Sequence, residues 1–168
     1  MESLPNRVWR FGDDVNTDQI VPGRFAPYMT SEAELRKAPF VEARPEFAGE
    51  VRPGDVIVAG PNFGCGSSRE YAAQALRLCD LGAILAPSFA RIFYRNALNL
   101  GLPLIECDGR ELADGSPVRL DLEQGRLHHE AGTLALPEIP PIARDVWAVG
   151  GLVPYVRRYG RLPVEVAR

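Results

Sequence analysis

Two serines and an arginine, Ser67, Ser68 and Arg69, follow one another in a glycine-rich stretch between a strand pattern and a helix pattern. Ser67 and Glu70 have capping-box spacing, which predicts that the serines lie at the positive end of the helix. Free backbone N–H groups, the helix dipole and a guanidinium together favour binding of a carboxylate or phosphate. An ordinary Ser-capped glycine turn contains the same residues, so local spacing leaves both interpretations open.

A second polar segment lies near the start of the chain and includes Asn16, Thr17 and Asp18. It is too polar for a buried strand and lacks the glutamate-terminated spacing of an EF-hand. It is either a solvated turn rich in Asp and Asn or a loop that faces a ligand.

Cysteine and histidine give no metal-binding pattern. Cys65, Cys79 and Cys107 are widely spaced and fit no common zinc or iron–sulfur motif, so we expect this chain to bind no metal by itself. The apolar patterns around Cys79 and Cys107 are typical of core residues. His128 and His129 are adjacent, so in a strand they point to opposite faces and we expect surface positions.

Size and composition indicate one globular domain over residues 1–168. The net charge of −3 and the absence of a basic stripe argue against nucleic-acid binding. No apolar run approaches the length of a membrane span, and the first residues lack signal-peptide features. We therefore expect no membrane association and a cytoplasmic location.

The middle of the chain predicts an α/β fold, because short apolar runs alternate with helical patterns in the order βαβαβ. In a parallel sheet of this kind, ligands bind beyond the carboxyl ends of the strands, where the Ser67–Arg69 turn falls. Ile92 is expected to face inward from the second helix, and a β-hairpin is expected at 118–129. The expected βαβαβ elements are a strand at 56–59, a helix at 71–79, a strand at 83–86, a helix at 89–100 and a strand at 102–106.

Four motifs follow one another along the chain, and they are Asn16-Thr-Asp-Gln-Ile20, Pro22-Gly23, Asn62-Phe-Gly-Cys-Gly-Ser-Ser-Arg-Glu70 and Ser88-Phe-Ala-Arg-Ile-Phe-Tyr-Arg-Asn96. Together they resemble the swivelling domain of the aconitase superfamily. The resemblance extends from about Val8 to Tyr159, and its nearest groups are the small subunits of 3-isopropylmalate dehydratase and homoaconitase. It implies a swivelling β/β/α domain with a central parallel βαβαβ unit and an additional β-hairpin.

The resemblance implies a hydro-lyase that isomerises a hydroxy di- or tricarboxylate by dehydration and rehydration. A partner large subunit is expected to hold a 4Fe–4S cluster, and this chain none. By the family pattern, Ser67 is the base that removes the carbon-bound proton, while Ser68 and Arg69 bind a substrate carboxylate. Asn16, Thr17 and Asp18 would orient groups at the edge of the cleft.

Arg91 and Arg95 also belong to the matching motifs. They are weaker candidates for substrate binding, and a structural salt bridge is an equally good interpretation of either.

The resemblance also implies that the segment after Pro22-Gly23 reads the variable arm of the substrate. This segment contains Arg24, Phe25, Ala26 and Pro27. Its apolar residues favour the isopropyl group of isopropylmalate. Arg24 and the order of residues in the segment leave homoaconitate open as the substrate. An alternative from a different class is a non-catalytic interaction module that binds an anion.

Overall fold

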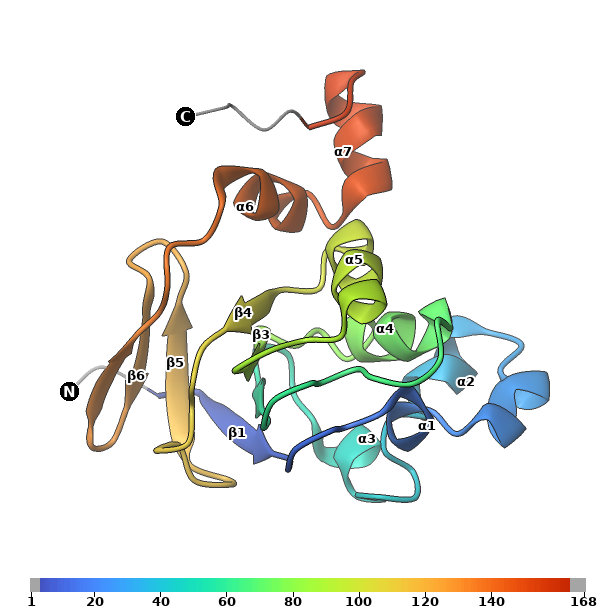
Figure 1. Cartoon of the computed structure of the whole chain (residues 1–168), viewed down its shortest axis with the longest axis horizontal. Helices are drawn as coiled ribbons and strands as arrows, with labels where there is room; N and C mark the ends of the chain where they lie inside the picture. Colours follow the sequence, from blue (N-terminus) through green and yellow to red (C-terminus); the bar gives the residue numbers. More distant parts are fainter. Residues whose placement is uncertain (1–3, 164–168) are drawn as a thin grey trace.

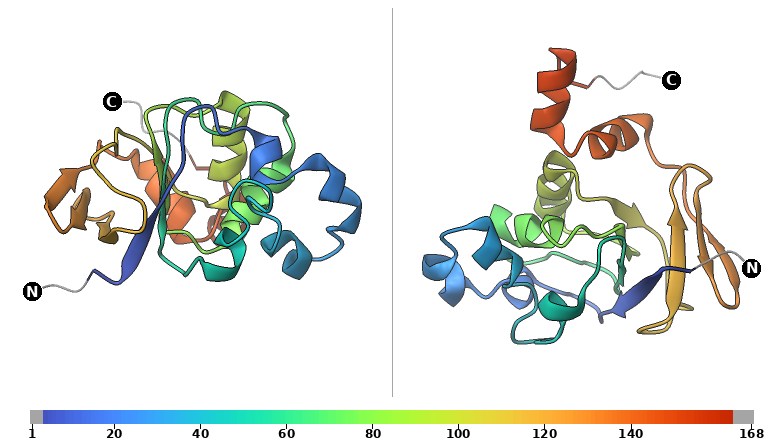
Figure 2. Two further views of the ribbon diagram at one scale, coloured as in Figure 1. Left: turned by 90° about the horizontal axis from the view of Figure 1, so that it is seen from below. Right: turned by 180° about the vertical axis from the view of Figure 1, so that it is seen from behind.

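The computed structural model describes residues 4–163, and within them the chain forms a seven-stranded mixed sheet in the order β4-β3-β2-β1-β5-β6-β7. Most of the helices cover one side of the parallel strands, and the antiparallel strands lie at the other end of the sheet (Figures 1 and 2). The strands are β1 (Asn6–Arg10), β2 (Val56–Val58), β3 (Ala83–Ala86), β4 (Leu104–Glu106), β5 (Pro117–Asp121), β6 (Arg126–His129) and β7 (Gly132–Ala135).

The predicted βαβαβ unit is confirmed as β2, α4 (Glu70–Arg77), β3, α5 (Arg91–Leu100) and β4, with all three strands parallel. β1 extends the parallel part through the pairing of Val8 with Val56. Gly101 ends α5 in the left-handed conformation, with φ of 73°, which glycine adopts without steric cost.

One expectation for α5 was wrong. Ile92 was expected to face inward, but 53% of its surface is exposed. Phe93 and Ala97, four residues apart, occupy the buried face of the helix. Ile92 precedes Phe93 by one residue, which turns it about 100° away from that face.

The predicted hairpin is confirmed as β5 and β6, and β7 extends it into an antiparallel meander. Val118 and Leu127 are fully buried on its inner face. His128 and His129 are partly buried. His128 Nδ1 lies 3.2 Å from Thr133 Oγ1, and His129 Nε2 lies 3.5 Å from a Glu111 carboxylate oxygen.

The sheet separates two hydrophobic clusters, and alternate residues of β2 enter different ones. Ile57 packs with the helices on one face, while Val56 and Val58 pack with the meander and α6 on the other. Because both faces are covered, β2 is buried throughout, as its continuous apolar run predicts.

The long segment between β1 and β2 contains four short helices. Ser31 caps α2, since its hydroxyl accepts the Glu34 N–H at 3.2 Å. Of these helices, α1 and α2 lie beside α4, whereas α3 lies below α1 (Figure 1). The four helices are α1 (Thr17–Ile20), the 3₁₀ helix η1 (Gly23–Tyr28), α2 (Glu32–Arg36) and α3 (Phe47–Glu50).

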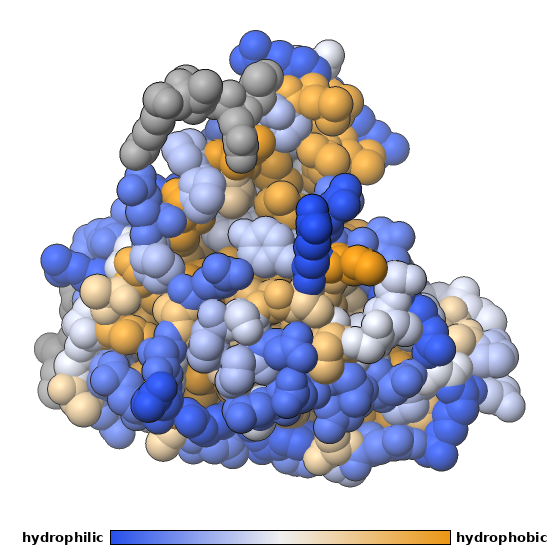
Figure 3. All heavy atoms as spheres, viewed as in Figure 1, coloured by the Kyte–Doolittle hydropathy of each residue, from blue (hydrophilic) through white to orange (hydrophobic). Residues whose placement is uncertain are grey.

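Two helices, α6 (Pro141–Ala148) and α7 (Leu152–Tyr159), follow the meander. α7 projects beyond α5, and apolar side chains gather around it above a largely hydrophilic lower half (Figures 1 and 3). None of the helices between residues 4 and 163 has the combination of length and apolar character needed to cross a bilayer.

Candidate active site

The two polar segments singled out in the sequence lie against each other beyond the carboxyl ends of β1 and β2. The Thr17 N–H donates to the Cys65 carbonyl at 2.8 Å, and the Gly64 N–H donates to the Val15 carbonyl at 2.7 Å. Asn16 and Cys65 form an isolated parallel bridge. The segment around Thr17 is therefore part of the same site as the glycine-rich loop, and not a separate solvated turn.

Two glycines give the loop its path. Gly64 and Gly66 have φ values of 82° and 100°, which other residues rarely adopt. A Cβ on Gly64 would also collide with the Phe93 ring. The loop can therefore pass directly over the start of α5 and bring Ser67 to Thr17.

Ser67 is held by Thr17 through two contacts. The Ser67 N–H donates to Thr17 Oγ1 at 3.0 Å, and the two hydroxyl oxygens lie 3.1 Å apart. Thr17 is buried and Ser67 is partly buried. If the Ser67 hydroxyl lost its proton, the neighbouring Thr17 hydroxyl could donate a hydrogen bond to it.

The predicted capping box of Ser67 and Glu70 is wrong. α4 begins at Glu70 with Arg69 at the N-cap position, and no side chain caps it. Ser67 lies two residues before that cap, and its hydroxyl contacts Thr17 instead. The capping box of this site belongs to α1, where Asn16 and Gln19 bond reciprocally at 2.8 Å. The Asn16 side chain thus stabilises the helix that presents Thr17.

Arg69 is anchored through one of its terminal nitrogens. Its Nη1 donates to Asp18 Oδ1 at 2.9 Å and to the Tyr71 hydroxyl at 2.8 Å. These contacts, the one with Tyr71 first, raise the pKa of the guanidinium above its ordinary value, so Arg69 keeps its charge. Nε and Nη2 make no hydrogen bond to any described residue, which leaves this edge for a ligand. Ser68, just before it, is exposed.

The segment after Pro22 forms η1, which lies beside the start of α4. Arg24 forms an ion pair with Glu42, and its guanidinium lies 4.9 Å from the centre of the Phe25 ring. Ala26 and Pro27 are exposed and Phe25 is partly buried.

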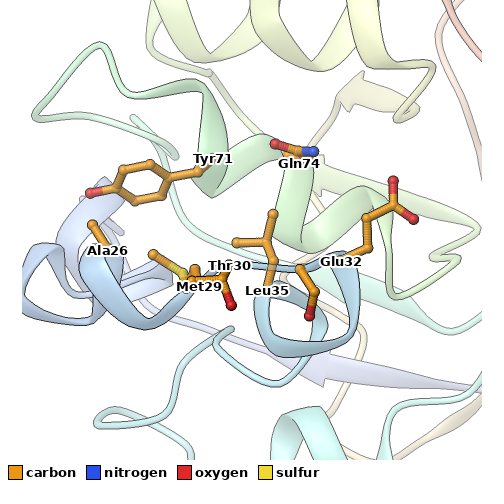
Figure 4. Close-up of a pocket in the computed structure, with 8 residues that line it drawn as sticks. Ala26, Met29, Thr30, Glu32, Leu35, Tyr71 and Gln74 are labelled. Carbon is orange, nitrogen blue, oxygen red and sulfur yellow. The ribbon is translucent and has the colours of Figure 1, made fainter.

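A cavity of about 300 Å³ lies between η1, α2 and α4 (Figure 4). Tyr71 reaches across it from α4. Ala26, Met29 and Leu35 give it an apolar wall, so a branched alkyl group is compatible with this side of the site. The complete lining is Ala26, Met29, Thr30, Ser31, Glu32, Leu35, Tyr71 and Gln74.

The structure does not provide salt bridges for Arg91 and Arg95. Both are exposed at the start of α5, and neither forms an ion pair with any residue in the described range 4–163. Within this range, the structural salt bridge considered for each of them is not formed, and their roles stay predictions.

The cysteines do not come together in the fold. Cys79 is buried and Cys107 is partly buried, and burial raises the pKa of each thiol to about 11. Cys65 lies in the glycine-rich loop, with its Sγ 3.5 Å from the Asp14 carbonyl oxygen. In the part of the chain that is described, no three His, Cys, Asp or Glu side chains are arranged to hold a metal ion.

The profile of the aconitase C-terminal domain family matches residues 15–108, from the Thr17 segment to the end of the βαβαβ unit. This chain belongs to that family. 3-Isopropylmalate dehydratase small subunit 1 of Deinococcus radiodurans is 50% identical over 95% of this chain and 90% of its own length. The homoaconitase small subunit of Thermus thermophilus is 47% identical over 95% and 99%.

A solved structure confirms the fold. The 3-isopropylmalate dehydratase chain from Methanocaldococcus jannaschii is 41% identical and superposes with a TM-score of 0.85. The superposition covers 92% of this chain and 93% of that one. The relatives are thus small subunits of hydro-lyases of the aconitase family, as the sequence motifs predicted, and the interaction-module alternative has no support among them.

Two residues at the site had no predicted role: Tyr71, and Gly23, which belongs to one of the family motifs. Tyr71 contacts Arg69, and a Cβ on Gly23 would collide with Arg69 Nη1. Tyr71 follows Arg69 by two residues in the sequence, but a tyrosine in the first turn of an amphipathic helix usually packs against the core. Gly23 gave the signal of an ordinary Pro-Gly turn.

Proposed function

We propose that this chain is the small subunit of a cytoplasmic hydro-lyase, folded as one domain over residues 1–168 and active only with a large subunit. The observation that carries the proposal is the pairing of Ser67 with Thr17 beside an arginine anchored by Asp18. This pairing occurs in a chain whose relatives are dehydratase and homoaconitase small subunits.

Ser67 is the proposed base that removes the carbon-bound proton of the substrate. A serine hydroxyl is a very weak acid, so its alkoxide needs hydrogen-bond donors and positive charge nearby. Thr17 Oγ1 accepts the Ser67 N–H, and its own hydrogen remains available to donate to Ser67 Oγ at 3.1 Å. An ionised Ser67 has no hydrogen to give, so in that state Thr17 is the donor.

Arg69 is the proposed clamp for a substrate carboxylate. Its Nη1 is engaged by Asp18 and Tyr71, which leaves Nε and Nη2 as a fork that can bind both oxygens of a carboxylate. Ser68, exposed next to the clamp, would donate to the same carboxylate. Asn16, Thr17 and Asp18 then form the edge that orients Ser67 and Arg69.

The large subunit is the proposed carrier of the 4Fe–4S cluster. The donor set of this chain does not fit such a cluster, because its three free cysteines lie in separate parts of the fold. On the partner, the cluster would bind the substrate hydroxyl and a carboxylate and so assist departure of the hydroxyl. This chain supplies the proton acceptor and the second carboxylate site.

We propose 2-isopropylmalate as the substrate. The cavity beside η1 has an apolar wall, and Arg24 is engaged by Glu42 rather than held free for an additional carboxylate. Homoaconitate, in lysine biosynthesis, is the second candidate, supported by the 47% identity to the Thermus thermophilus homoaconitase small subunit.

The test is turnover by complexes reconstituted with a large subunit of each class. We expect dehydration of isopropylmalate with a kcat/KM at least about tenfold above that for homoisocitrate, since an additional carboxylate placed against the apolar wall of the cavity, which also contains Glu32, costs more than about 1.4 kcal/mol. The opposite preference would reassign the substrate. Absence of turnover with either class would overturn the proposed function.

A further inference from the structure

Tyr71 has a polar contact that the packing of α4 does not require. It lies in the first turn of the helix, and its ring forms part of the cavity wall beside η1 (Figure 4). A phenylalanine would fill that position equally well. The hydroxyl extends further and accepts a hydrogen bond from Arg69 Nη1 at 2.8 Å.

This contact completes the anchoring of one guanidinium nitrogen. A terminal guanidinium nitrogen carries two hydrogens, and at Nη1 one is directed to Tyr71 and the other to Asp18. The Asp18–Arg69 pair is exposed, with 63% and 44% of the side-chain surfaces accessible. An exposed ion pair alone restrains an arginine weakly. The second contact, from a side chain on a different element, fixes the rotation of the guanidinium plane.

The anchored nitrogen also lies against the first residue of η1. A Cβ on Gly23 would collide with Nη1, and the Gly23 N–H lies 3.3 Å from the same Asp18 oxygen that binds Arg69. Tyr71, Arg69 and the start of η1 are therefore one contiguous unit. The position of the guanidinium depends on both α4 and the segment that forms the cavity.

We infer that Tyr71 is a positioning residue, which holds the Arg69 guanidinium so that Nε and Nη2 face the substrate carboxylate and which links this clamp to the cavity beside η1. The inference rests on the proposed function. Tyr71 does not touch the reacting atoms. Removal of the Tyr71 hydroxyl should therefore weaken substrate binding more than it slows the proton transfer at Ser67.

The test uses the reconstituted complex with Tyr71→Phe, which keeps the ring and removes the hydroxyl. We expect KM to rise about three- to tenfold, the effect of one hydrogen bond, with a smaller change in kcat. Tyr94→Phe is the matched control, because Tyr94 is a partly buried tyrosine of α5 whose hydroxyl makes no hydrogen bond to a described residue. It should leave both constants unchanged.

A double-mutant cycle separates positioning from a packing effect. In an Arg69→Lys background the group that Tyr71 orients is gone, so Tyr71→Phe should add almost nothing to KM. An equal rise in both backgrounds would overturn the inference. Gly23→Ala serves as a second variant, because it displaces the guanidinium without touching Tyr71, and it should raise KM in the same way.

The outcomes distinguish this inference from the proposed function. Wild-type turnover that depends on Ser67, together with an unchanged KM for both Tyr71→Phe and Gly23→Ala, would overturn the inference and leave the function standing. Absence of wild-type turnover with either class of large subunit would overturn both.

Discussion

At the scale of single residues, the contact between Ser67 and Thr17 carries the proposed chemistry. Thr17 is buried, and its hydroxyl contacts both the backbone N–H and the side chain of Ser67. The same hydroxyl thus positions the proposed base and would donate a hydrogen bond to its ionised form. A hydrogen bond to a charged group is stronger than a hydrogen bond between two neutral groups.

Thr17→Val tests this contact, because it keeps the shape of the side chain and removes the hydroxyl. We expect kcat of the reconstituted complex to fall about 10- to 100-fold, the value of one hydrogen bond to a charged group. Thr133→Val, which removes a hydroxyl near His128 on the meander, should leave kcat unchanged. An unchanged kcat for Thr17→Val would show that Thr17 does not stabilise an ionised Ser67.

At the scale of elements, the site depends on the turns that follow the parallel strands. The βαβαβ order was predictable because each strand and helix has its own local apolar pattern. The partner of Ser67 was not, because Thr17 lies 50 residues earlier in the chain and no local spacing contains that contact. The capping-box expectation failed for the same reason, since a tertiary contact replaced the local one.

Asp55, just before β2, bonds to residues of β1, and this contact predicts an effect on stability. It is fully buried before β2 and accepts the N–H groups of Arg7 and Arg52 and the indole N–H of Trp9, each at 3.0 Å. Asp55→Asn replaces one acceptor oxygen by a donor. We expect a loss of about 3 kcal/mol in the free energy of unfolding, measured with urea.

The matched control for Asp55 is Asp108→Asn, at an exposed aspartate that bonds to Arg110. It should leave the urea midpoint almost unchanged. A midpoint for Asp55→Asn that equals the one for Asp108→Asn would contradict the role given to Asp55.

The ion pair between Asp114, in the turn before β5, and Arg44, in the segment before α3, predicts a pH dependence of stability. Arg44 donates to both Asp114 oxygens, at 2.8 and 3.2 Å, and this contact lowers the pKa of Asp114 below its ordinary value. The unfolded chain therefore takes up this proton at a higher pH than the folded one. The stabilisation is present at neutral pH and is lost as the pH falls from about 4 through the lowered pKa.

Urea unfolding at neutral pH and at about pH 3 measures this effect. The decrease in unfolding free energy on acidification should be smaller for Asp114→Asn than for the wild type, since the variant has no carboxylate to protonate. Equal decreases would show that Asp114 titrates alike in the folded and unfolded chains.

At the scale of the whole molecule, we propose that the chain presents one half of a site. Residues from α1, the glycine-rich loop and η1 meet at the carboxyl edge of the parallel strands, and the meander and α6 cover the opposite face of the sheet. The family motifs, and cysteines that do not suit a cluster, led to the prediction that the other half of the site lies on a large subunit. We expect the isolated chain to have no hydro-lyase activity and the complex with its large subunit to have it.

The measurement that tests the central claim most directly is steady-state turnover by the complex reconstituted with Ser67→Ala. If Ser67 is the base, kcat should fall about 10²- to 10⁴-fold, the contribution of a positioned general base. Ser116→Ala, at a serine whose hydroxyl bonds only to the Ala113 carbonyl among the described residues, should keep full activity. Size-exclusion chromatography would verify that both variants assemble. An intact Ser67→Ala complex with near-wild-type kcat would contradict the account.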